Sequence, residues 1–162
     1  MTAAPATSAP RHDPAHLVAA GLARLDAVPT ALPALILRLG VALVFWRSGQ
    51  IKLASWDLTV ALFRDEYRLP LLPPEFAAYL ATTAEHLAPV MLVLGLGARL
   101  GAAAMLGMTL VIQALVYPMS YPDHLLWAGP LLYILLRGPG WLSFDHLIRR
   151  RFRPELKSPA SA

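Results

Sequence analysis

The sequence predicts an all-α integral membrane protein, built as a four-helix bundle with an amphipathic outer-loop helix and short amphipathic terminal helices. Of its 162 residues, 57% are hydrophobic and only 15% are charged, whereas an ordinary soluble domain has roughly 25% charged residues. A soluble fold of this size needs charged side chains to cover its surface, but a lipid-facing fold does not. Four apolar stretches separated by short connections approach the ~20 residues that a membrane-spanning helix needs.

The first expected elements precede the bundle. Residues 1–13 are small, polar and proline-bearing, and should form a disordered tail. Apolar residues then recur at helical spacing over residues 14–29, which predicts an amphipathic helix on the membrane surface. The membrane domain should cover residues 30–141, with spans at about 32–53, 76–97, 99–117 and 122–137. The fourth span is the shortest, so local thinning of the bilayer or burial against its neighbours must compensate.

Two further helices are expected outside the spans. In the first loop, Trp56, Val60, Phe63 and Tyr67 recur at helical spacing and alternate with charged residues. This pattern is typical of an amphipathic helix at the outer interface. Residues 142–162 should form a basic cytoplasmic helix and tail, in which a serine, Ser143, can cap the helix.

The distribution of basic residues predicts the orientation in the membrane. The only basic residues in the first and third loops are Arg64 and Arg68, and several acidic residues accompany them. The positive-inside rule therefore places both termini in the cytoplasm of a bacterial inner (plasma) membrane. The remaining basic residues flank the spans in the termini and the second loop, where they fit contact with anionic lipid rather than nucleic acid, so no nucleic-acid partner is expected. These residues are Arg11, Arg24, Arg99, Arg149, Arg150, Arg151, Arg153 and Lys157.

Polar side chains inside the spans are the candidate functional residues, because each costs free energy in hydrocarbon. A rise of ~1.5 Å per residue puts several of them at similar depth in the outer half of the bundle. We predict that they line one outer-leaflet cavity, formed by Arg47, Lys52, Glu85, His86, Gln113, Tyr117 and His124. None can be assigned a catalytic role. Glu85, His86 and His124 are metal-ligand types without diagnostic spacing, so no metal site is assigned.

Several of these polar residues also have a purely structural interpretation. Glu85 with Arg47 or Lys52 can be a buried ion pair that only fixes helix register, and His86 fits a hydrogen-bonded packing residue. In the first span, Arg38 shares a helical stripe with Lys52, whereas Arg47 points to the opposite side. We expect Arg38 to extend to the cytoplasmic headgroups.

Short motifs along most of the chain, from about Leu35 to Leu147, resemble the DoxX family of small four-span membrane proteins. They are Arg38-Leu39-Gly40, Ser48-Gly49-Gln50-Ile51-Lys52-Leu53, Glu85, the segment from Gly95 to Arg99, and Arg137-Gly138-Pro139-Gly140-Trp141-Leu142-Ser143-Phe144-Asp145. Trp141 and Phe144 depart from the smaller aliphatic residues often found there. The resemblance implies a membrane accessory subunit of a redox or stress-response complex, and it also suggests a role in metal stress.

The polar cluster and the resemblance lead to one main functional hypothesis. We expect a redox-associated subunit, rather than a stand-alone enzyme, whose cavity holds a quinone or another small amphiphile. No cofactor is evident otherwise: the chain has no cysteine, haem-ligand pair or nucleotide loop, so electrons would come from a protein partner in the membrane or periplasm. The alternatives are a membrane partner or transporter for a modified metal-binding peptide, and a structural assembly factor. The sequence leaves a homo-oligomer open.

Overall fold

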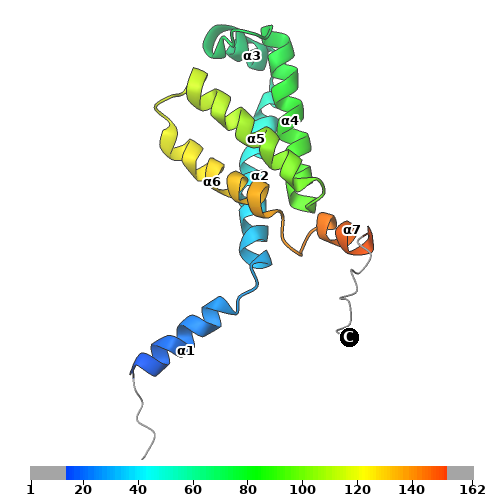
Figure 1. Ribbon diagram of the computed structural model, residues 1–162. Helices are drawn as coiled ribbons and strands as arrows, with labels where there is room; N and C mark the ends of the chain where they lie inside the picture. Colours follow the sequence, from blue (N-terminus) through cyan, green and yellow to red (C-terminus); the bar gives the residue numbers. More distant parts are fainter. Residues whose placement is uncertain (1–13, 153–162) are drawn as a thin grey trace, which may run out of the picture.

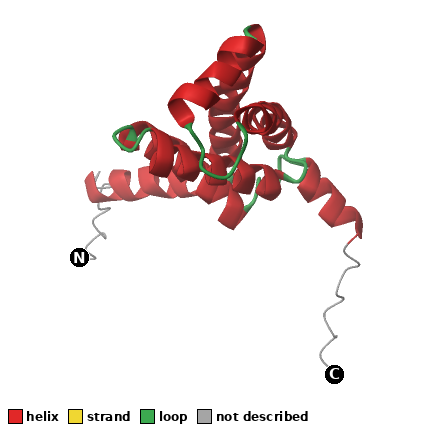
Figure 2. Ribbon diagram, turned by 90° about the horizontal axis from the view of Figure 1, so that it is seen from above, coloured by secondary structure: helices red, strands yellow, loops and turns green. Residues whose placement is uncertain are grey.

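A computed structural model describes residues 14–152, and every regular element within this range is helical (Figure 2). The elements in chain order are α1 (Pro14–Asp26), α2 (Ala31–Ala54), α3 (Trp56–Ala61), the π-helix η1 (Leu62–Tyr67), α4 (Pro74–Leu94), α5 (Ala98–Val111), the π-helix η2 (Ile112–Val116), α6 (Tyr121–Arg137) and α7 (Phe144–Phe152). The predicted all-α class is therefore confirmed. The tails expected at residues 1–13 and 153–162 lie outside the described residues.

Four helices form the bundle. α2 packs against α4, α4 against α5, and α5 against α6, while α2 also contacts α6 (Figure 1). Many of the residues in their shared core are small, which allows the helices to approach closely; this core consists of Val41, Ala42, Phe45, Ala88, Leu92, Ala98, Ala102, Met105, Leu131 and Ile134. Large apolar side chains such as Leu43, Leu100 and Leu126 instead face outward, as a lipid-facing surface requires.

The helix lengths fit a membrane protein. α2, α4 and the combined α5–η2 helix (Ala98–Val116) are long and apolar enough to cross a membrane. α6 occupies the segment of the expected fourth span but has 17 residues, which rise only ~26 Å. Its contacts with α5 and α2 bury its inner face, and this burial is one way to accommodate a short helix.

Arg38 holds one end of the bundle together, and the prediction that it reaches the headgroups is wrong. The residue is only 1% exposed. Its guanidinium donates hydrogen bonds to the carbonyls of Leu92 and Val93 in the last turn of α4, at 2.6 and 2.7 Å. It also donates to the carbonyls of Pro139 and Leu142 in the loop before α7, at 3.0 and 2.7 Å. Carbonyls at a helix end have no partner within the helix, so the arginine satisfies them while it links three segments.

The start of α7 completes this end of the bundle. The Asp145 carboxylate accepts hydrogen bonds from the backbone N–H groups of Gly97 and Ala98, at 2.8 and 3.1 Å. A carboxylate is favourable there because the N-terminus of α5 carries partial positive charge. The Ser143 hydroxyl accepts a bond from the His146 backbone N–H at 3.2 Å, which confirms the predicted cap.

The opposite end of the bundle is covered by α3 and η1 (Figure 1). The predicted outer-loop helix is present, but it is divided into an α-helical and a π-helical part. Val60 and Phe63 are buried against Ala77 and Ala78 of α4, with Tyr67 packed beside them. The apolar face of this loop therefore packs on the protein, where it helps to close the cavity described below.

Candidate functional site

A buried salt bridge between α2 and α4 lies at the centre of the candidate site. The Lys52 Nζ atom is 2.8 Å from Glu85 Oε1, and the two side chains are only 10% and 4% exposed. The Ser48 hydroxyl donates to the same Glu85 oxygen at 3.0 Å and accepts from Lys52 Nζ at 2.9 Å. Ser48 and Lys52 are four residues apart and so share one helix face. One Glu85 oxygen thus receives two donors from α2.

Glycine at position 49 allows the two helices to meet at this point. A Cβ atom added to Gly49 would lie 2.6 Å from His86 Cε1 and 3.2 Å from Glu85 Cβ. These distances are too short for a normal contact with His86, so any side chain at position 49 would push α4 away or displace the histidine. The close approach of α2 and α4 is what brings Lys52 within bonding distance of Glu85.

The second carboxylate oxygen of Glu85, Oε2, is buried and has no hydrogen-bond partner among the described residues. A buried acceptor without a donor costs ~1–3 kcal/mol. The described residues supply no donor for this oxygen.

The salt bridge forms part of the wall of a cavity of about 430 Å³. Most of the wall is apolar or aromatic, with Phe63, Tyr67, Met108 and Trp127 among the larger side chains. The polar groups on the wall come from different elements: Ser48 and Lys52 from α2, Glu85 from α4, the Tyr67 hydroxyl from η1, Tyr117 after η2, and His124 with the Trp127 indole N–H from α6. A mainly apolar cavity of this size with a few convergent polar groups is typical of a small-molecule site.

His124 is fixed by its neighbours. Its Nδ1 atom is 2.6 Å from Gln113 Oε1, and Gln113 Nε2 donates to the Pro118 carbonyl at 2.7 Å. The imidazole ring also packs on Trp127, with ring centroids 5.2 Å apart. The residue is 5% exposed, so Gln113 orients a buried histidine on the cavity wall.

Two tyrosines stand at the α3–η1 end of the cavity. The Tyr117 hydroxyl donates a hydrogen bond to the Glu66 carboxylate of η1, and the rings of Tyr67 and Tyr117 meet edge to face at 5.9 Å. Tyr67 is the last residue of η1 and Tyr117 directly follows η2. The extra residue in a π-helical turn changes the direction of the side chains that follow it. Burial raises the pKa of Tyr67 above its ordinary value, so the phenol stays neutral at physiological pH.

The structure brings together only part of the predicted set. Lys52, Glu85, Tyr117 and His124 line the cavity, and Gln113 contributes through its bond to His124. Arg47 is exposed on α2 and does not line the cavity. The partner of Glu85 is therefore Lys52, and Arg47 has no part in the pair.

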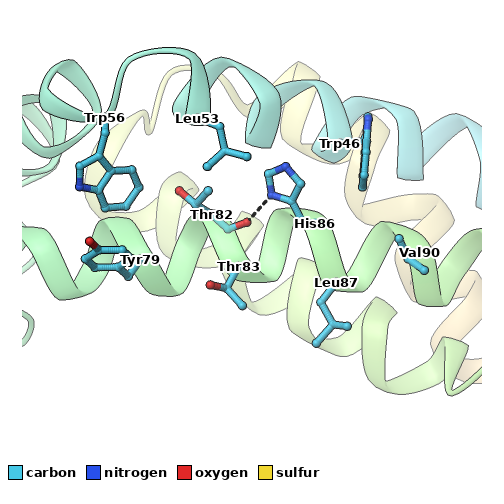
Figure 3. A pocket seen from close by; sticks show the side chains of 9 residues that line it. All are labelled: Trp46, Leu53, Trp56, Tyr79, Thr82, Thr83, His86, Leu87 and Val90. Atoms are coloured by element: carbon cyan, nitrogen blue, oxygen red, sulfur yellow. Dashed lines mark hydrogen bonds between the residues drawn. The ribbon is translucent and has the colours of Figure 1, made fainter.

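His86 lies in a separate apolar groove along α2, α3 and α4 (Figure 3). Its Nδ1 atom is 2.7 Å from the Thr82 carbonyl, and its Nε2 atom is 3.0 Å from Gln50 Nε2. The ring also contacts Trp46, with centroids 5.1 Å apart. Because both ring nitrogens are engaged away from the cavity, this histidine is a packing residue.

The alternative of a metal site at Glu85, His86 and His124 gains no support, because His86 does not face the cavity that the other two residues line. Across residues 14–152, no group of three or more His, Cys, Asp or Glu side chains is placed to hold a metal ion.

Ser48 and the aromatic residues of the cavity wall were not among the predicted site residues. The signal for Ser48 was its position four residues before Lys52. Trp127 looks like an interfacial aromatic in the sequence, but here it packs edge to face on Phe45 at 5.9 Å. Its place on the wall depends on how α6 packs against α2, which no local pattern reveals.

Comparison with known proteins identifies the family. The DoxX family model matches residues 34–118, which is more than half of the chain. The matched segment contains Ser48, Lys52 and Glu85 but ends before His124. No curated protein and no solved structure matches the chain. This helical membrane protein therefore belongs to the DoxX family.

Proposed function

We propose that the cavity binds a quinone or another small amphiphile, and that the protein is an accessory subunit of a redox or stress-response complex in the bacterial inner membrane. In this proposal the chain crosses the membrane four times with both termini in the cytoplasm. The observation that carries it is the Lys52–Glu85 pair on the wall of a mainly aromatic and aliphatic cavity, with one carboxylate oxygen left unpaired.

The wall of the cavity suits a molecule that is apolar over most of its length and polar at one end. Phe63 and Trp127 offer ring faces and edges to a flat apolar body. A carboxylate paired with a cation can hydrogen-bond a ring oxygen and can also accept or return its proton. A quinone ring with an isoprenoid or alkyl tail has this chemistry.

A purely structural role for the ion pair explains less of the geometry. A pair that only fixes the register of two helices needs no adjacent empty volume, and both carboxylate oxygens could be satisfied by the helices themselves. Here the cavity lies beside the pair and Glu85 Oε2 lacks a donor. These two features favour a binding site.

The proposed role as a subunit rests on which ligands for electron-carrying cofactors the sequence contains. The chain has no cysteine for an iron–sulfur cluster. We therefore propose that electrons are exchanged between the bound molecule and a partner protein in the membrane or periplasm, while this chain holds and orients the molecule.

Extraction of the purified protein tests the proposal. Protein isolated in mild detergent is treated with organic solvent, and the released quinones and other amphiphiles are quantified by mass spectrometry. We expect one such compound to be enriched over an unrelated membrane protein prepared in the same way. Glu85→Gln should lose most of it, whereas Glu75→Gln, at an exposed position in the first turn of the same helix, should retain it. Equal content in both variants, or no enrichment, would contradict the proposal.

A further inference from the structure

The hydrogen-bonding groups on the cavity wall bear on which oxidation state of a bound molecule the cavity favours. The first unsatisfied group is Glu85 Oε2. The other oxygen, Oε1, already accepts from Lys52 and Ser48, but Oε2 is buried without a donor. A carboxylate in a salt bridge can only accept hydrogen bonds. A molecule that satisfies Oε2 must therefore bring a donor of its own.

The second unsatisfied group is the Nε2 atom of His124. The Pro118 carbonyl can only accept, so the nitrogen of the Gln113 amide must face it. The amide oxygen of Gln113 then faces His124 Nδ1, and this ring nitrogen must carry the proton that lies between them. A neutral imidazole has one donor and one acceptor, so Nε2 is the acceptor. None of the described residues forms a hydrogen bond with it.

Several donors on the cavity wall are already directed to protein acceptors. The Ser48 hydroxyl proton is directed to Glu85, and Lys52 Nζ uses two of its protons on Ser48 and Glu85. The Tyr117 hydroxyl proton goes to Glu66. The third proton of Lys52 remains, and the wall also carries the Tyr67 hydroxyl and the Trp127 indole N–H. The cavity thus combines these donors with two acceptors that have no donor of their own, Glu85 Oε2 and His124 Nε2.

We infer that the cavity selects the reduced, dihydroxy form of a ring-bearing amphiphile, a hydroquinone, over the oxidised quinone. This inference rests on the proposed function. A hydroquinone hydroxyl can donate to Glu85 Oε2 and accept from Lys52, and its second hydroxyl can donate to His124 Nε2. The oxygens of a quinone only accept, so they can take the donors of Lys52, Tyr67 and Trp127 but satisfy neither acceptor. Leaving a buried acceptor unpaired is the main penalty against the quinone.

Binding to the intact protein in lipid nanodiscs tests the inference without any mutation. The probes are a decyl-substituted benzohydroquinone, the matching benzoquinone, and the dimethyl ether of the hydroquinone, which keeps the ring and tail but has no donor. Titrations are carried out under anaerobic conditions, and empty nanodiscs measure partition into lipid. We expect the hydroquinone to bind at least ~10-fold more tightly than either of the other two, as the loss of hydrogen bonds to a charged group predicts.

Variants then identify the residues that cause the preference for hydroquinone over quinone. Glu85→Gln should remove most of the difference between hydroquinone and quinone, and His124→Phe should reduce it severalfold. Glu75→Gln and His16→Gln, at exposed positions in α4 and α1, should keep the wild-type ratio. Equal or tighter binding of the quinone to the wild-type protein would overturn the inference and leave the proposed function standing. Binding of none of the three probes would overturn both.

Discussion

At the scale of single residues, the Lys52–Glu85 pair is a feature with a large energetic consequence. Both side chains are nearly buried, and two ions removed from water are stable together only because each offsets the charge of the other. The pair therefore makes each residue dependent on its partner.

Lys52→Met removes the positive charge and leaves a buried carboxylate without a counter-ion. We expect the free energy of unfolding to fall by ~3–5 kcal/mol, whereas the double variant Lys52→Met/Glu85→Leu should recover much of that loss. Reversible unfolding in detergent micelles, followed by circular dichroism, measures both values. Arg47→Met, at an exposed position five residues earlier, should change stability by no more than ~0.5 kcal/mol. Additive losses in the double variant would contradict a coupled pair.

The sequence predicts position along the bundle axis better than it predicts direction around a helix. A fixed rise per residue correctly grouped Lys52, Glu85 and His124, but it also included Arg47 and His86, which point elsewhere. Consecutive residues such as Glu85 and His86 are separated by ~100° around the helix axis. Two neighbours at the same depth therefore face different surfaces, and only the packing of α2 against α4 decides which one meets the cavity.

Long-range partners escape prediction for a related reason. The stripe in α2 that holds Arg38 is buried, as its helical spacing indicates. Its hydrogen-bond partners, however, lie 54 to 104 residues further along the chain. A local pattern contains no information on these carbonyls, so the sequence alone assigns a charged residue near a span end to the membrane surface.

At the scale of elements, the sequence locates the long helices well because each is one long, mainly apolar run. The helices at Ala31–Ala54 and Tyr121–Arg137 lie within one residue of the expected segments. The two π-helices were not foreseen. They form where α3 and α5 end beside the cavity, and their irregular turns depend on tertiary packing, which periodicity does not encode.

The junction between α4 and α5 depends on a glycine. Gly95 has φ +66°, and an added Cβ would lie 2.4 Å from Ser143 Cβ and 2.7 Å from Arg38 Nη2. We expect Gly95→Ala to lower the free energy of unfolding by ~2–4 kcal/mol, because a left-handed backbone costs ~1–2 kcal/mol for alanine and the clash adds to it.

Gly107→Ala is the matched control, since a Cβ there would meet nothing within 4 Å. Alanine within a helix should stabilise the protein by up to ~1 kcal/mol relative to glycine. Thermal unfolding of the two variants side by side makes the comparison. A neutral effect of Gly95→Ala would show that this junction is not as tightly packed as described.

At the scale of the whole molecule, α1 and α7 lie at one end of the bundle and α3 with η1 at the other (Figure 1). This arrangement agrees with the four-span topology that we propose, in which both termini are cytoplasmic. The absence of native cysteine makes the topology simple to test, because one introduced cysteine reports a single position.

His16→Cys in α1, Phe152→Cys in α7 and Arg64→Cys in η1 provide the three reporters, all at exposed positions. A membrane-impermeant maleimide applied to intact cells should label only the Arg64→Cys variant, since the positive-inside rule places the other two in the cytoplasm. The other two should react after permeabilisation. Labelling of the Phe152→Cys variant but not of the His16→Cys variant in intact cells would require an odd number of spans. Labelling of both would require the opposite orientation.

Photocrosslinking measures directly where in the protein the amphiphile binds. A hydroquinone that carries a photoreactive decyl tail is irradiated with the protein in nanodiscs, and the adducts are located by peptide mass spectrometry. We predict adducts on residues that line the cavity beside Glu85, such as Phe63, Tyr67 and Trp127, and their loss when unlabelled hydroquinone is added in excess. Adducts confined to the groove of Trp46, Tyr79 and Val90, or adducts that unlabelled hydroquinone does not displace, would contradict the proposed binding site.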